Sequence, residues 1–306
     1  MGEAVELLRK AHALAPNDGL VMSALGAALM RSSLMASGED ARVEAEDWAL
    51  RALASDPSIA ETYTTLGLVR LHQGNLKASL KAFREALARN PRSAEANSYV
   101  GRFLAEAGNT TEGVRRMELA LRVDPAMQRA WWDLARTYAL MGEHAKADAA
   151  LDRGEAAGGS PDTSFMARGR ITLWRGDVEG ARALVARMES LAVDGSAGRK
   201  ALLPALRSMV ENGGVPDPSA DVSHVFAAVV RSPSNRTFVW QVSTEVRAAG
   251  GDVDGALDAL EKAASLALMD LLWLDRCPVL APLRESPRYG KVRAAVAART
   301  AELLGA

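Results

Sequence analysis

The sequence has little that marks a secreted, membrane-bound or strongly charged protein. Its 306 residues contain one cysteine, Cys277, which excludes an internal disulfide framework and fits a reducing compartment. No apolar run approaches the roughly 20 residues that a bilayer-spanning helix needs. The formal net charge is −1, so no overall field favours nucleic acid or an anionic membrane. We therefore expect a cytoplasmic protein that binds neither nucleic acid nor a membrane surface.

Sequence motifs of catalysis are also missing. No glycine-rich loop follows a predicted strand, and neither a phosphate-binding loop nor a kinase catalytic-loop pattern is present. The four histidines lie far apart, and no Cys/His cluster has the spacing of a zinc site. The sequence therefore predicts no enzyme, no cofactor and no metal site within these residues.

The sequence does contain an internal period of 34 residues, which is clearest in residues 60–93. Like residues recur in four columns at this step: Tyr63, Asn97, Trp131 and Phe165; Gly67, Gly101, Ala135 and Gly169; Gly74, Gly108, Gly142 and Gly176; and Phe83, Met117, Leu151 and Val185. Each period is one structural unit, and Pro91 and Pro125 close two of them.

Each unit has the pattern of two helices. Apolar residues such as Leu66 and Val69, and later Phe83, recur at three- and four-residue spacing, which places them on one helix face. Gly74-Asn75 separates the helices, since glycine accepts a positive φ and asparagine caps the next helix. An isolated pair cannot bury its apolar face, so the pairs must stack. The predicted fold is therefore all-α, a solenoid of stacked helical hairpins.

These features resemble the tetratricopeptide repeat over about residues 1–195. The resemblance implies a right-handed superhelix whose first helices line a concave groove, and it implies binding rather than chemistry. The segment from Ala4 to Pro16 matches only the second half of a unit. We interpret it as a truncated opening repeat, and a single-helix cap is the alternative. Between Pro16 and Pro57 seven surplus residues fall around Ser32–Glu39, where we predict a longer loop between helices.

After Gly195 the 34-residue register is lost, although the helical pattern continues. We therefore divide the chain into a repeat array, residues 1–195, and divergent helical repeats with a C-terminal cap, residues 196–306. Residues 238–300 resemble the end of the repeat region in eukaryotic-like serine/threonine protein kinases of myxobacterial type. Their most specific stretch is Trp273-Leu274-Asp275-Arg276-Cys277-Pro278. This resemblance implies an interaction or sensor region of a bacterial signalling protein, with any kinase domain outside these residues.

Two functions follow from these patterns. The first is a non-catalytic scaffold that binds a protein or peptide. The alternative is a regulatory domain that senses a small molecule and controls a neighbouring catalytic domain. Exposed ends of the repeat array also allow self-association.

A column of arginines is the candidate site for a partner. Directly after the Gly67 column come Leu68, Arg102, Arg136 and Arg170, which in the resembled fold face the concave groove. Arginine suits bidentate contacts with carboxylate or phosphate groups, so we expect an acidic or phosphorylated peptide there. Aromatic anchors are expected from Tyr99, Trp132 and Trp174.

Two further expectations concern the same groove. Of a chaperone-type carboxylate clamp, only Arg129 fits its column. The competing interpretation of the arginine column is a neutral lining, in which Arg102 pairs with Glu106 and Arg136 with Asp133 at helical spacing.

Overall fold

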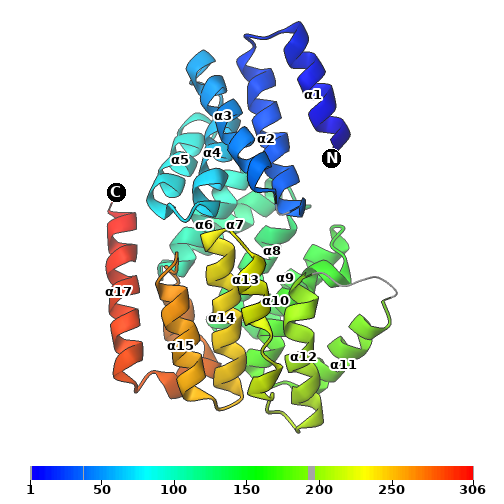
Figure 1. Ribbon diagram of the computed structural model, residues 1–306, viewed down its shortest axis with the longest axis vertical. Coiled ribbons are helices and arrows are strands. Elements are labelled where there is room, and N and C mark those ends of the chain that lie inside the picture. Colours follow the sequence, from blue (N-terminus) through cyan, green and yellow to red (C-terminus); the bar gives the residue numbers. More distant parts are fainter. Residues whose placement is uncertain (1, 37, 192–196, 306) are drawn as a thin grey trace. The chain divides into compact units, whose positions relative to one another are not determined.

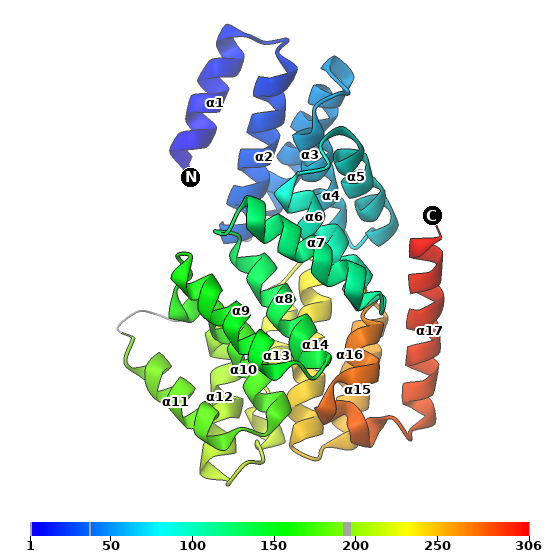
Figure 2. The same cartoon turned by 180° about the vertical axis from the view of Figure 1, so that it is seen from behind.

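The computed structural model describes residues 2–36, 38–191 and 197–305, and these residues form helices and no strand (Figures 1 and 2). The chain divides into two compact units, one ending at Val100 and the other running from Gly101 to Gly305. Among the described helices, none combines the length and apolarity needed to cross a bilayer. The domain boundary predicted at residues 195 and 196 lies outside the described residues.

The first unit is built from antiparallel helix pairs. Its helices are α1 (Gly2–Leu14), α2 (Gly19–Ala36), α3 (Glu39–Ser55), α4 (Ala60–His72), α5 (Leu76–Arg89) and the first part of α6 (Ala94–Glu106). Helix α2 packs on α3, and α4 packs on α5 around the fully buried Phe83. The two-helix unit predicted for residues 60–93 is confirmed.

The turns that begin at Gly74, Gly108 and Gly176 have the predicted chemistry, whereas Glu143 after Gly142 makes no side-chain cap. Gly74 has φ +78°, and the Asn75 side chain accepts a hydrogen bond from the backbone N–H of Ala78 at 3.1 Å. Asn109 and Asp177 cap the helices of later hairpins in the same way. A left-handed glycine followed by an Asx cap therefore marks these turns in both sequence and structure.

The longer loop predicted around Ser32–Glu39 was wrong. Helix α2 continues to Ala36 and α3 begins at Glu39, so α2 has 18 residues where α4 has 13. The surplus lengthens α2 because neither glycine nor proline stands between Gly26 and Gly38. The hydroxyl of Ser33 also donates to the carbonyl oxygen of Met30 at 2.7 Å, which keeps this polar residue compatible with a helix.

The second unit continues with hairpins and ends in shorter helices. Its hairpin helices are α7 (Thr110–Val123), α8 (Gln128–Leu140), α9 (His144–Ala156), α10 (Pro161–Arg175), α11 (Val178–Glu189) and α12 (Ala197–Glu211). The remaining elements are η1 (Pro218–Ala220), α13 (Ser223–Val229), α14 (Pro233–Ala249), α15 (Val253–Ala264), α16 (Leu271–Arg276), η2 (Pro278–Leu283) and α17 (Pro287–Leu304). The last helix begins after its Ser286 cap and ends at Leu304.

The C-terminal helices fold back onto the hairpins of this unit. Helix α14 packs on both α10 and α15, and α15 packs on α17 (Figure 1). One apolar core joins Met117 of a hairpin to Trp273 and Val296 of the C-terminal helices. Cys277 lies in this core with a free thiol and no exposed surface. This fold-back decides which surfaces remain open.

Small residues bring the paired helices together. A Cβ added at Gly101 of α6 would lie 2.8 Å from the carbonyl oxygen of Gly113 on α7, and one added at Gly113 would lie 2.7 Å from the carbonyl oxygen of Gly101. In both cases the obstacle is backbone, which cannot rotate aside. The two glycines therefore set the separation of α6 and α7.

We predict that Gly101→Ala destabilises the protein by about 1–3 kcal/mol, because the helices must separate to admit the methyl group. Urea unfolding at neutral pH measures the loss. Gly290→Ala is the matched control, since Gly290 is exposed in α17 and has nothing within 4 Å of an added Cβ. The control should be neutral or gain up to about 1 kcal/mol. Equal stabilities of the two variants would contradict the close approach.

Candidate binding surfaces

Arg170 of the predicted groove makes a buried ion pair within the chain. Its Nε and Nη2 donate to the two carboxylate oxygens of Glu245 on α14, at 2.9 and 2.5 Å. Glu245 has no exposed surface and also accepts from the indole N–H of Trp273 at 2.7 Å. Burial acts to lower the pKa of Arg170, but the Glu245 carboxylate outweighs it and holds this pKa above its usual value. An acidic ligand at Arg170 would have to displace Glu245.

Arg136 and Arg102 also hold carboxylates of this chain. Arg136 donates to Asp270, which caps α16 by accepting from the backbone N–H of Trp273 at 3.0 Å. The pairing of Arg102 with Glu106 is confirmed, with Nε at 2.7 Å from the carboxylate. The pairing proposed between Arg136 and Asp133 was wrong, because Asp270 occupies that place and Asp133 lies beside Arg129 instead, at 3.7 Å.

The carboxylates that pair with Arg102 and Arg136 are both buried, but their pKa values shift in opposite directions. Burial acts to raise the pKa of Glu106, but the guanidinium groups of Arg102 and Arg136 outweigh it and hold that pKa below its usual value. Burial raises the pKa of Asp270 above its usual value despite Arg136, and the neighbouring charge of Glu106 adds to the rise. The charge of the arginine column is thus compensated within the chain.

The expected aromatic anchors are mostly internal. In the first unit Tyr99 is buried and stacks on Phe83, with ring centroids 4.9 Å apart and planes 2° apart. Trp174 is buried, and the Arg170 guanidinium lies 5.2 Å from its ring centroid. Trp132 is partly buried against the core, and Arg129 is half exposed. Of the predicted site residues, Arg129 is exposed, and Arg102, Trp132 and Arg136 reach the surface in part. A binding role for any of the seven stays a prediction.

The partners that sequence reasoning missed are Glu245 and Asp270. Neither belongs to a 34-residue column, so periodicity gave no reason to select them. A signal for Glu245 does exist: it stands three residues after Val242 and directly before Val246, on the buried side of α14. A carboxylate on such a face needs a buried cation, since an isolated buried charge is costly.

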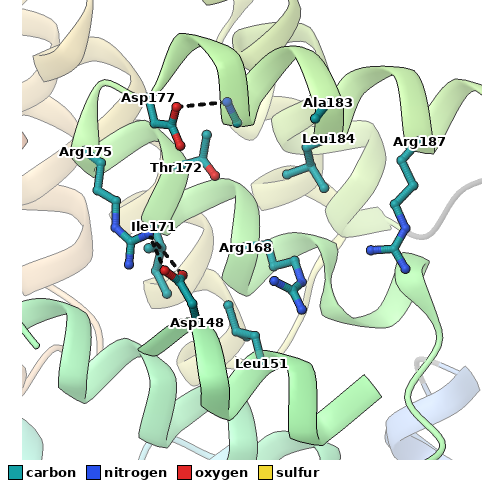
Figure 3. Close-up of a pocket in the computed structure, with 11 residues that line it drawn as sticks. Asp148, Leu151, Arg168, Ile171, Thr172, Arg175, Asp177, Ala183, Leu184 and Arg187 are labelled. Atoms are coloured by element: carbon teal, nitrogen blue, oxygen red, sulfur yellow. Dashed lines mark hydrogen bonds and ion pairs between the residues drawn. The ribbon is translucent and has the colours of Figure 1, made fainter. Parts of the chain in front are cut away.

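An open crevice lies on the second unit where α9, α10 and α11 meet (Figure 3). We call it the α9–α11 crevice, and its volume is about 300 Å³. Its lining residues are Asp148 and Leu151 of α9, Arg168, Ile171, Thr172 and Arg175 of α10, Asp177 before α11, and Gly180, Ala183, Leu184 and Arg187 of α11.

The three arginines of this crevice are matched by carboxylates. Arg175 donates to both oxygens of Asp148, at 3.0 and 3.1 Å (Figure 3). Arg168 and Arg187 both bond to Glu155, at 2.7 and 3.0 Å. Burial acts to raise the pKa of Glu155, but hydrogen bonds from Ser164 and these arginines lower it to about 2. The crevice therefore offers a ligand little net positive charge.

A second crevice lies one repeat earlier, where α7, α8 and α9 meet. We call it the α7–α9 crevice, and its volume is about 450 Å³. It is lined by Glu118, Leu121, Arg122, Trp131, Leu134, Tyr138, Lys146, Ala149, Ala150 and Arg153. Six lining positions are shared by the two crevices at a step of 34 residues. They are Leu134, Tyr138, Lys146, Ala149, Ala150 and Arg153 in the α7–α9 crevice, and Arg168, Thr172, Gly180, Ala183, Leu184 and Arg187 in the α9–α11 crevice. The crevice is thus a product of the repeat.

Comparison with known proteins bears on the fold. The tetratricopeptide repeat family model matches residues 60–93. No match was found among curated proteins.

Within the described parts of the chain, no group of three or more His, Cys, Asp or Glu side chains is placed to hold a metal ion.

Three solved structures illustrate the similarity. The chain is similar to a structure of the APC/C hetero-tetramer Cut9-Hcn1, with a TM-score of 0.55 and 16% identity over 96% of this chain and 58% of that chain. A tetratricopeptide repeat protein from Parabacteroides merdae gives a TM-score of 0.49 and 15% identity, over 88% and 97%. A thermophilic tetratricopeptide repeat protein in Thermus thermophilus gives 0.45 and 21%, over 55% and 91%. The first likeness shows an all-α helical repeat fold.

We predict that Arg170→Met costs about 3–5 kcal/mol of stability, because it leaves the Glu245 carboxylate buried without its cation. The double variant Arg170→Met/Glu245→Leu should recover most of this loss, since no charge then remains buried. Urea unfolding of the wild type, both single variants and the double variant gives the coupling free energy between Arg170 and Glu245. Arg182→Met, which removes an exposed ion pair with Glu179, should change stability by less than about 0.5 kcal/mol. A double variant no more stable than Arg170→Met would contradict the buried pair.

The lowered pKa of Glu155 predicts a pH dependence. A carboxylate whose pKa falls on folding stabilises the protein above its unfolded value of 4.5, and this contribution is lost as pH falls toward about 2. Wild type should therefore exceed Glu155→Gln in stability at pH 7, and the difference should shrink below pH 4.5. Urea unfolding from pH 7 to pH 3 measures it. A difference that stays constant over this range would show that the Glu155 pKa is not lowered.

Proposed function

We propose that this chain is a non-catalytic scaffold that binds a protein or peptide, with side chains of the partner entering the crevices between hairpins. The observation that carries this proposal is the recurrence of one open crevice at a 34-residue step, each copy lined by three successive helices. Stacked repeats present equivalent surfaces at regular intervals, and such surfaces suit an extended segment. The repeat match at residues 60–93 supports the same function.

The proposal keeps the acidic or phosphorylated partner expected from the arginine column, but with fewer arginines to contact it. Arg102 and Arg129, together with Trp132, remain at the surface of α6 and α8. Arg136 and Arg170 hold Asp270 and Glu245, so a ligand on the column would contact its more exposed members.

The cellular setting is a further part of the proposal. We place the scaffold in the cytoplasm as the interaction or sensor region of a bacterial signalling protein such as a serine/threonine kinase. The support is the resemblance of residues 238–300, including the buried Trp273 and Cys277, to the end of such regions. A kinase domain in the same reading frame is the finding expected from genomic sequence, and its absence would remove this setting.

A small-molecule sensor is the second candidate. The volumes of the two crevices, about 300 and 450 Å³, lie in the lower part of the range of small-molecule sites. This function would require an uncharged or amphiphilic metabolite to stabilise the second unit on binding.

One pair of experiments separates the two functions. Selection from a displayed library of random peptides tests the scaffold, and thermal unfolding against a metabolite collection tests the sensor. We expect enriched peptides with a shared pattern and no metabolite that raises the Tm by more than about 2 °C. Enrichment of no peptide, together with a stabilising metabolite, would reverse the assignment.

A further inference from the structure

The lining of the α7–α9 crevice holds more cations than carboxylates, with Arg122, Lys146 and Arg153 against Glu118. Arg122 of α7 and Arg153 of α9 are exposed at its rim, and their guanidinium groups form no ion pair with any residue in the described part of the chain. Lys146, the third cation, pairs with Glu143 and lies 5.4 Å from the ring centroid of Tyr138. The rim therefore holds two arginines available to an acidic ligand.

The floor of the same crevice is apolar. Trp131, Leu134 and Tyr138 of α8 contribute its base, and the polar atoms of the two aromatic residues are already bonded. The indole N–H of Trp131 donates to the carbonyl oxygen of Pro125 at 2.9 Å, and the Tyr138 hydroxyl donates to Glu118 at 2.8 Å. Burial and this bond to Glu118 raise the pKa of Tyr138 to about 12, so the hydroxyl stays neutral at physiological pH. What the floor offers a ligand is apolar surface.

The α9–α11 crevice shows why Arg153 is unpaired. Arg187 occupies the equivalent position there and bonds to Glu155 at 3.0 Å. The residue 34 positions before Glu155 is Leu121, so Arg153 has an apolar side chain where Arg187 has a carboxylate. Glu155 thus compensates the arginines of the α9–α11 crevice, whereas Leu121 leaves the arginines of the α7–α9 crevice unpaired above an apolar floor. Of these two crevices, the α7–α9 crevice is the one that combines a free cationic rim with such a floor.

We infer that the α7–α9 crevice binds a short segment of a partner protein in which an acidic side chain stands next to an aliphatic or aromatic one. The carboxylate pairs with Arg122 and Arg153, and guanidinium groups suit this contact because they bind carboxylates bidentately. The apolar neighbour rests on the floor formed by Trp131 and Tyr138. A volume of about 450 Å³ accommodates a few side chains and no folded domain, so the ligand is a segment. This inference rests on the proposed scaffold function and specifies its ligand.

Three fluorescein-labelled dodecapeptides of glycine and serine test the inference: one with glutamate-leucine pairs, one with glutamates alone and one with lysine-leucine pairs. Fluorescence anisotropy should show binding of the first, at least about tenfold weaker binding of the second, and none of the third. Arg122→Glu/Arg153→Glu should weaken the first peptide by at least about tenfold. Ala149→Trp, which fills the crevice without changing charge, should weaken it equally.

Arg84→Glu/Arg92→Glu is the matched control. These two arginines are exposed on the first unit, and their reversal changes the net charge by the same amount. Binding of the first peptide should change by less than about twofold. An equal loss in this control would show a general charge effect and overturn the inference, as would full binding to Ala149→Trp or equal binding of the glutamate-only peptide. If none of the dodecapeptides binds while library selection enriches neutral or basic peptides, the inference fails and the scaffold function stands.

Discussion

The buried pair of Arg170 and Glu245 is the interaction on which the second unit depends. It joins α10 of a hairpin to α14 of the C-terminal segment, with both side chains almost fully removed from solvent. Removing two charges from water is costly, and only close, bidentate geometry with further hydrogen bonds offsets the cost. The second bond from Trp273 to Glu245 supplies such support and extends the arrangement to α16. A shift of α14 along α10 would leave a charge unpaired, so the pair specifies the register of these helices.

This constraint redirects the surface chemistry of the repeat. In the resembled fold, the arginine column would present its guanidinium groups to a partner in the groove. Here Asp270 and Glu245 take the positions that carboxylates of such a partner would take, and they come from the same chain. The surfaces left open are the exposed remainder of the column and the crevices between hairpins. Binding at the mouths of the crevices needs no rearrangement of the core, since lining residues such as Lys146, Arg153 and Ala183 are exposed there.

The repeat makes comparable sites, and single substitutions between repeats make them different. Leu121 and Glu155 are equivalent positions, as are Leu134 and Arg168. In one crevice these residues leave an apolar floor beneath unpaired arginines, whereas in the other they complete a set of ion pairs. The turns Gly142-Glu143 and Gly176-Asp177 share a left-handed glycine, and six lining positions are equivalent, so the difference in binding chemistry rests on side chains.

The sequence by itself determined the hairpins and their turns. The 34-residue columns and Gly74 with Asn75 are local signals that depend on backbone geometry within one unit. The prediction of a loop failed at residues 32–36, where the absence of glycine and proline mattered more than composition. Tertiary structure alone decided that the arginine column is satisfied internally, that Asp270 and not Asp133 meets Arg136, and which cations stay unpaired. The physical reason is that ion pairing follows distance in space, and Arg136 and Asp270 stand 134 residues apart in sequence, where no periodicity links them.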